Sequence, residues 1–106
     1  MPPAELEGLL QNHPKVYDVA VIGIYDAENA TEVLRAYIVT APGIIRGQET
    51  EGKITRWLAE RVVHHKRLRG GIQFVDEIPE SAAGKIMRRV LQDQAKQEER
   101  KRMMKL

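Results

Sequence analysis

The ten-residue run at positions 16–25, VYDVAVIGIY, constrains the fold more than any other feature of the sequence. Successive side chains of a strand point to opposite faces of a sheet. From Val19 onward both alternating sets of this run are apolar. A strand of this kind has an apolar surface on each side, so we expect it to be covered on both faces.

Two further strands and three helices are expected around this strand. Short apolar runs predict the strands, and apolar residues spaced three and four apart predict the helices. The predicted strands are 32–40 and 72–75, and the predicted helices are one that ends before Asn12, one over 50–65 and one that starts after Lys85. Thr50 is the predicted N-cap of the second helix.

The order helix, strand, strand, helix, strand, helix predicts an α+β domain. The short connection between the first two strands favours antiparallel pairing. We therefore predict a small three-stranded, mainly antiparallel sheet with helices packed against it. This domain accounts for residues 1–92. Beyond Leu91 the apolar helix face fades, so residues 93–106 are predicted to be a polar, basic helical extension or a disordered tail.

The charged residues are distributed unevenly along the chain. Residues 1–84 carry 9 basic and 12 acidic side chains, whereas residues 85–106 carry 8 basic and 3 acidic ones. The basic character therefore belongs to the last helix. A basic helix can attract phosphates, although it is more often a solvated face.

The composition excludes several classes of protein. With 42% hydrophobic and 30% charged residues, the 106-residue chain is typical of one small soluble globular domain. Its apolar runs are too short to cross a bilayer, and its N-terminus lacks a secretion signal, so we expect a cytoplasmic protein. The absence of cysteine excludes disulfides and thiolate metal sites.

The segment 70–89, GGIQFVDEIPESAAGKIMRR, places a lysine directly after a glycine. A strand-like run is followed by an acidic turn and by Pro79, which cannot continue a sheet ladder. A small-residue loop then leads to Lys85 at the predicted mouth of the last helix. A lysine on a short mobile loop can carry its ammonium to an anion bound elsewhere. Taken alone, the dipeptide Gly84-Lys85 favours an ordinary loop-to-helix junction with a solvated lysine.

The segment 76–86, DEIPESAAGKI, resembles the last signature of the adenylate-forming superfamily of acyl-CoA ligases, adenylation domains and luciferases. That signature reads approximately Asp-x-hydrophobic-Pro-Lys-Ser-x-x-Gly-Lys-hydrophobic, and Glu80 stands where the family usually has a second lysine. Residues 3–7 and both predicted long strands are also similar to family segments. The resemblance covers almost the full chain and is closest to the branch of 4-coumarate–CoA ligases.

The resemblance implies that the chain, over residues 1–92, is the AMP-binding C-terminal lid domain of an ATP-dependent carboxylic acid–CoA ligase. Such enzymes form an acyl-AMP from a small carboxylic acid and ATP, and then transfer the acyl group to CoA. Lys85 matches the catalytic lysine, and Ser81 and Gly84 belong to its substrate and ATP-phosphate loop. ATP and Mg²⁺ bind mainly to an N-terminal adenylation domain, the expected covalent partner. The isolated chain is therefore expected to be inactive.

Three basic residues before the third strand, Lys66, Arg67 and Arg69, are candidates for binding the phosphates of CoA. An equally good interpretation is that they solvate a helix end. The neighbouring pair His64-His65 predicts no metal site, because adjacent helical side chains point about 100° apart.

Two other functions are compatible with a small basic domain. One is a nucleic-acid-binding module that uses the last helix, although the chain lacks the aromatic pairs typical of RNA recognition, so no nucleic-acid partner is expected. The other is a stand-alone interaction domain without catalysis. The C-terminal residues Met104, Lys105 and Leu106 approximate the Ser-Lys-Leu peroxisomal address, which makes the peroxisome the alternative to the cytoplasm.

Overall fold

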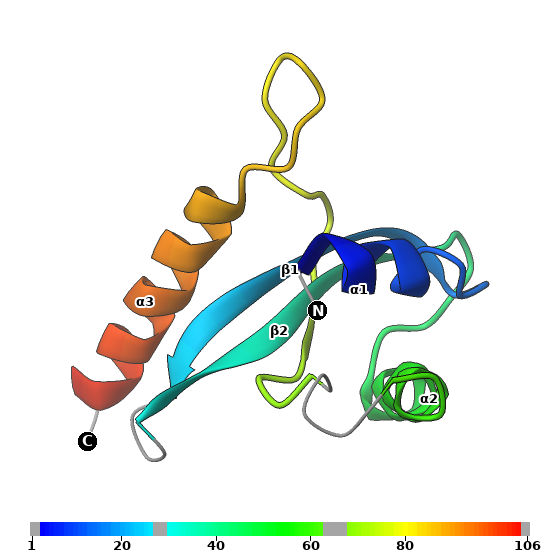
Figure 1. The fold of residues 1–106 in the computed structure, drawn as a ribbon, viewed down its shortest axis with the longest axis horizontal. Coiled ribbons are helices and arrows are strands. Elements are labelled where there is room, and N and C mark those ends of the chain that lie inside the picture. The colour runs from blue at the N-terminus through cyan, green and yellow to red at the C-terminus, as the bar shows by residue number, and fades with distance from the viewer. Residues whose placement is uncertain (1–2, 27–29, 63–67, 105–106) are drawn as a thin grey trace.

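The computed structural model describes residues 3–26, 30–62 and 68–104. Its elements follow the predicted order and confirm the α+β class (Figure 1). They are helix α1 (Pro3–Leu10), strands β1 (Val16–Asp26) and β2 (Thr31–Thr40), helix α2 (Gln48–Ala59), strand β3 (Ile72–Phe74) and helix α3 (Arg88–Met104).

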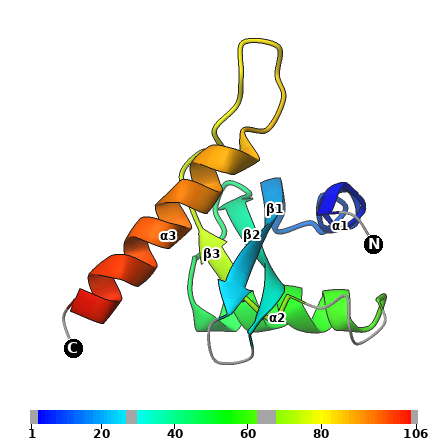
Figure 2. The same ribbon diagram turned by 60° about the vertical axis from the view of Figure 1, so that its left-hand side comes forward.

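The three strands form one mixed sheet in the order β1-β2-β3 (Figure 2). Strands β1 and β2 pair antiparallel along nearly their whole length, as predicted. Strand β3 is short and pairs parallel with β2, with Ala36 opposite Ile72 and Ile38 opposite Phe74. The parallel pairing follows from the crossover through α2, because a chain that returns over a helix re-enters the sheet in the same direction.

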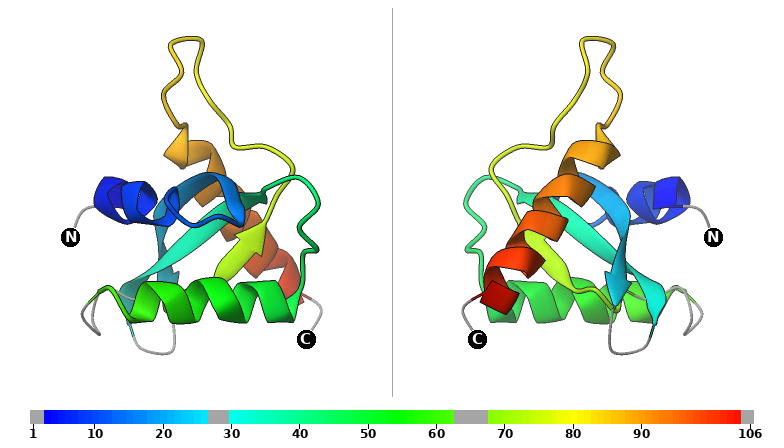
Figure 3. Two further views of the ribbon diagram at one scale, coloured as in Figure 1. Left: turned by 90° about the vertical axis from the view of Figure 1, so that its right-hand side faces the viewer. Right: turned by 90° about the vertical axis from the view of Figure 1, so that its left-hand side faces the viewer.

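Both faces of β1 are covered, as its sequence predicts (Figure 3). Val19 and Val21 point to the face that carries α1 and α2, where they join a buried cluster with Leu6, Leu10, Ile54 and Leu58. Ala20 and Ile22 point to the opposite face, where they join Tyr37, Leu91 and Ala95. Helix α3 covers this second face, so the sheet lies between two layers of helix.

Two predicted helix starts are wrong. Helix α2 begins at Gln48, and Gly47 precedes it without a side-chain cap. Thr50 therefore lies inside the first turn. Its hydroxyl donates to the carbonyl oxygen of Ile45 at 2.6 Å and so closes the preceding loop. Helix α3 begins at Arg88, three residues after Lys85. The predicted end of the second helix near His65 lies outside the described residues.

Helix α3 continues to Met104 without interruption. Its buried side ends with Leu91 and Ala95, and the described side chains beyond Ala95 are exposed. Because the helix crosses residue 92, the division into a domain over 1–92 and an extension over 93–106 stays a prediction. None of the helices in the described ranges is long and apolar enough to span a membrane.

The connection after α1 buries a titratable side chain, His13, which is 6% exposed. Its Nδ1 accepts a hydrogen bond from the backbone N–H of Lys15 at 3.0 Å. Its ring meets Trp57 edge to face, with the centroids 5.0 Å apart. Burial and the neighbouring charges of Lys15 and Arg61 lower the pKa of His13. An accepting Nδ1 requires the neutral ring, and the lowered pKa favours the same form.

We therefore expect the free energy of unfolding to fall as the pH is lowered. A histidine with a lowered folded-state pKa contributes its stability fully above its unfolded pKa, 6.5, and loses it as the pH falls through the folded pKa. The variant His13→Asn keeps an acceptor for the Lys15 N–H but cannot titrate. Urea unfolding from about pH 7.5 to about pH 5 should show a smaller loss in this variant than in the wild type. Parallel pH profiles for the two chains would contradict the assignment.

Candidate functional site

The loop over residues 76–87, called here the lysine loop, projects from the body of the domain between β3 and α3 (Figures 1 and 3). The tip residues Ala82, Ala83, Gly84 and Lys85 are all exposed. No described residue forms an ion pair with Lys85. The ammonium of Lys85 is therefore held outside the domain and is free to meet an external anion.

The lysine loop is a narrow hairpin closed by its own hydrogen bonds. The backbone N–H of Ser81 donates to the carbonyl oxygen of Lys85 at 2.8 Å, and the N–H of Met87 donates to that of Pro79 at 2.8 Å. Glu80 and Ile86 form an antiparallel bridge between these two bonds. The two legs of the loop thus hold each other at a fixed spacing up to Lys85.

Ser81 and Gly84 build the turn that precedes the lysine. The carbonyl oxygen of Ser81 accepts from the N–H of Gly84 at 2.9 Å, and its hydroxyl accepts from the N–H of Lys85 at 3.3 Å. Gly84 has a φ of 79°, a left-handed conformation that glycine adopts without steric cost. These two residues therefore determine the direction in which Lys85 leaves the hairpin.

The prediction that Lys85 opens the last helix is wrong. Lys85 belongs to the hairpin, and Ile86 and Met87 precede α3. The physical reason is the hydrogen bond from Met87 to Pro79, which uses the backbone of the returning leg for the hairpin. Lys85 thus points from a hairpin tip and not along a helix axis.

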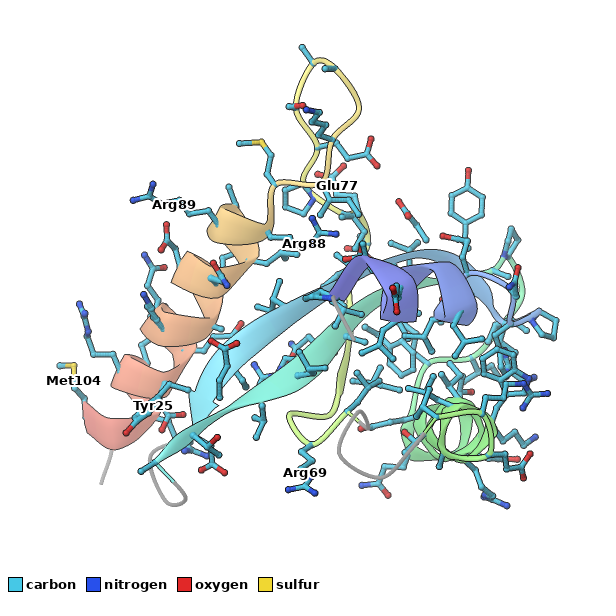
Figure 4. All side chains as sticks on the ribbon, viewed as in Figure 1. Tyr25, Arg69, Glu77, Arg88, Arg89 and Met104 are labelled. Carbon is cyan, nitrogen blue, oxygen red and sulfur yellow. The ribbon has the colours of Figure 1, made fainter. Side chains whose placement is uncertain are left out.

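The returning leg ends at an ion pair between the buried Glu7 of α1 and the half-buried Arg88. Arg88 is the first residue of α3 and is labelled in Figure 4. The Glu7 side chain is 10% exposed. Its Oε2 accepts from the N–H of Val21 at 2.7 Å and from Nε of Arg88 at 3.2 Å. Its Oε1 accepts from Nη2 of Arg88. This two-pronged contact joins α1, β1 and the start of α3.

This pair is not predicted from the sequence. Glu7 has the ordinary position of an acidic residue early in a helix, which the positive helix end alone would explain. The one available signal is its place between Leu6 and Leu10 on the apolar stripe of α1. A charged residue at such a position needs a buried partner. The partner, Arg88, lies 81 residues away in sequence, so spacing alone does not identify it.

Of the three candidate CoA-binding residues, the structure describes Arg69. Lys66 and Arg67, like His64 and His65, lie outside the described residues. Arg69 is exposed at the start of β3, at the opposite end of that strand from the lysine loop (Figure 4). The role of these residues in binding CoA stays a prediction.

The described part of the chain brings together no group of three His, Cys, Asp or Glu side chains that fits a metal ion. The groove lined by Tyr25, Arg35 and Lys96 lies between the β1–β2 hairpin and α3, away from Lys85. Among the described residues, Lys85 is distinctive because its exposed side chain stands on a projecting, hydrogen-bonded hairpin.

The chain is similar in sequence to known proteins. The family described as AMP-binding enzyme C-terminal domain matches residues 5–85. A phenylacetyl-CoA ligase of Aspergillus niger is 48% identical over 86% of this chain and 16% of its own length. The 4-coumarate–CoA ligase-like protein 1 of Arabidopsis thaliana is 46% identical over 86% of this chain and 16% of its own length.

A solved structure agrees with these sequence matches. The acyl-CoA synthetase of Brucella canis superposes with a TM-score of 0.84 at 30% identity, over 92% of this chain and 18% of that protein. The chain thus spans less than a fifth of the length of each of these three proteins.

We expect Gly84→Ala to loosen the hairpin without a steric clash. A methyl group at Gly84 meets nothing within 4 Å, so the variant isolates the cost of a left-handed backbone, about 1 kcal/mol. Relief of this strain opens the turn, so hydrogen exchange at the amides of Lys85 and Met87 should accelerate by roughly fivefold to tenfold.

The matched control is Gly43→Ala, because Gly43 has a φ of 83° and equally open surroundings in a different loop. This control should leave the exchange of the two hairpin amides unchanged. Equal acceleration in both variants, or none in Gly84→Ala, would show that Gly84 does not hold the turn.

Proposed function

The chain belongs to the family of AMP-binding enzyme C-terminal domains, and from this premise we propose that it is the lid of an ATP-dependent carboxylic acid–CoA ligase. In this role it delivers Lys85 to the adenylation site. The observation that carries the proposal is the exposed Lys85 at the tip of a hydrogen-bonded hairpin, without an ion-pair partner among the described residues. Similarity to proteins named as acyl-CoA ligases and an acyl-CoA synthetase supports the choice of reaction.

Adenylation concentrates negative charge on the acid, on the α-phosphate of ATP and on the departing pyrophosphate. A cation that is already in position stabilises such a transition state without reorganising water. The ammonium of Lys85 is a compact point charge on a flexible stem. The small side chains of Ala82 and Ala83 beside it let the hairpin tip enter a narrow site.

The remaining components are assigned to an N-terminal adenylation domain, which we propose as the covalent partner. ATP, the small carboxylic acid and Mg²⁺ bind mainly there, and Mg²⁺ supplies further charge neutralisation at the phosphates. The lysine stands on a projection and not inside a pocket of its own domain. A chain of this shape needs a second surface to complete a catalytic site, so the isolated chain should be inactive.

The second half-reaction requires the lysine to leave. CoA is the proposed co-substrate: its thiol gives up its proton and attacks the acyl carbon of the acyl-AMP, the carbon–sulfur bond forms, and the bond to the phosphate oxygen breaks as AMP leaves. This carbon belongs to the carboxyl group whose oxygens Lys85 approaches during adenylation. Rotation of the whole domain would remove the hairpin as a rigid unit and make room for the thiol. Arg69 remains a candidate for contacts with the phosphates of CoA, because it is exposed and basic.

The test uses a chimera in which this chain replaces the matching C-terminal segment of the A. niger phenylacetyl-CoA ligase. In the chimera Lys85→Ala should lower the rate of pyrophosphate release by about a hundredfold, because one preorganised charge-stabilising group is lost. Thioester formation from supplied phenylacetyl-AMP should be much less affected. The free energy of unfolding of the domain should change by no more than about 0.5 kcal/mol, since Lys85 is exposed.

Lys53→Ala is the matched control, because Lys53 is an exposed lysine of α2 that pairs with Glu49 at 3.2 Å. It should leave both half-reactions unchanged. The isolated 106-residue chain should release no pyrophosphate above a blank. Intact adenylation in Lys85→Ala, or an equal loss of both half-reactions, would refute the proposed role of the lysine.

A further inference from the structure

An arginine outside the lysine loop, Arg46, forms hydrogen bonds with the residues at which the loop leaves the sheet. Arg46 lies in the segment between β2 and α2. Its Nη2 donates to the carbonyl oxygen of Val75 at 2.7 Å, and its Nη1 donates to Oδ1 of Asp76 at 2.9 Å. Its Nε lies 3.4 Å from the hydroxyl oxygen of Thr40, at the end of β2. One planar guanidinium therefore ties the outgoing leg to the edge of the sheet.

The contact between Arg46 and Asp76 contributes little to the free energy of unfolding. The Asp76 side chain is 95% exposed and that of Arg46 is 38% exposed, and ion pairs this exposed contribute little to folding. The contact instead sets the direction of the outgoing leg of the lysine loop. A guanidinium with two donors on one leg fixes its orientation, which a single point charge does not.

The two legs of the lysine loop are therefore anchored by different arginines. Arg88 holds the end of the returning leg against Glu7. Arg46 holds the start of the outgoing leg at Val75 and Asp76. Ile78 and Ile86 pack against the apolar cluster under α3 and seat the base of the hairpin, but apolar contact is not directional.

We propose that Arg46 is a positioning residue for Lys85, which sets the angle at which the hairpin leaves the sheet. The inference rests on the proposed function of Lys85, because the angle of the hairpin matters only if its tip must reach a defined point. The hairpin acts as a lever. Its legs are bonded to each other up to Ser81 and Lys85, so a small rotation at Asp76 becomes a larger displacement of the ammonium.

The first test measures both half-reactions of the chimera with Arg46→Met and Arg46→Lys. Arg46→Met keeps the length of the side chain and removes all its donors. We expect adenylation to lose about tenfold in kcat, because misplacing a catalytic group by a fraction of an ångström has effects of this order. The KM values for ATP and phenylacetate and the rate of thioester formation should stay unchanged. Arg46→Lys retains the charge but lacks the planar guanidinium with its two donors, so it should recover only part of the lost adenylation rate.

The matched control is Lys53→Met, which removes a similarly exposed ion pair from α2. It should leave both half-reactions and the urea unfolding midpoint as in the wild type. A purely structural role of Arg46 would lower the unfolding midpoint and affect both half-reactions together, and that result would overturn the proposal.

The second test is independent of catalysis and uses the 106-residue chain. In Arg46→Met the amide chemical shifts of Glu77, Ser81 and Lys85 should move, while those of β1 and α2 stay in place. Unchanged shifts in the hairpin would overturn the anchoring role. Altered chemical shifts in the hairpin together with an unchanged adenylation rate would show that the anchoring by Arg46 has no effect on catalysis, and would overturn that part of the proposal. If Lys85→Ala itself leaves adenylation intact, the proposed function fails, the catalytic consequence fails with it, and the shifts still decide whether Arg46 anchors the loop.

Discussion

The structure depends on one buried carboxylate. Glu7 of α1 accepts hydrogen bonds from the Val21 N–H of β1 and from Nε and Nη2 of Arg88 at the start of α3. A carboxylate that is 10% exposed is costly without such partners. The arrangement that satisfies Glu7 therefore fixes where α3 begins. Because Arg88 directly follows the lysine loop, it also fixes where the returning leg of the hairpin ends.

Much of the fold follows from the sequence, because burial leaves a local signature. The two apolar sets of β1 predict helices on both faces, and the clusters around Val21 and Ile22 occupy those faces. The parallel pairing of β3 was not predicted, because it depends on contacts between distant segments. The early start of α2 was not predicted, because no side chain caps that helix end. Thr50 illustrates the limit: its hydroxyl serves the preceding loop and not the helix end.

The candidate site was predicted in part. The sequence indicates the glycine and lysine at positions 84 and 85, and the resemblance to the adenylate-forming superfamily, confirmed by the family match, gives them meaning. It does not indicate the hairpin, whose closing bonds join the backbones of Pro79 and Met87. Nor does it indicate Glu7 and Arg46, which reach the loop from elsewhere in the chain. The sequence predicts that a lysine lies on a loop, whereas the direction in which that lysine points depends on tertiary contacts.

The central claim is that Lys85 is presented by a preorganised hairpin and not by a flexible loop. The most direct measurement is backbone ¹⁵N relaxation of the 106-residue chain. The account predicts order parameters of about 0.8 or more for the amides of Ser81, Lys85 and Met87, close to those of the strands, with lower values confined to the tip at Ala82 and Ala83. Order parameters below about 0.6 throughout residues 79–87 would contradict it.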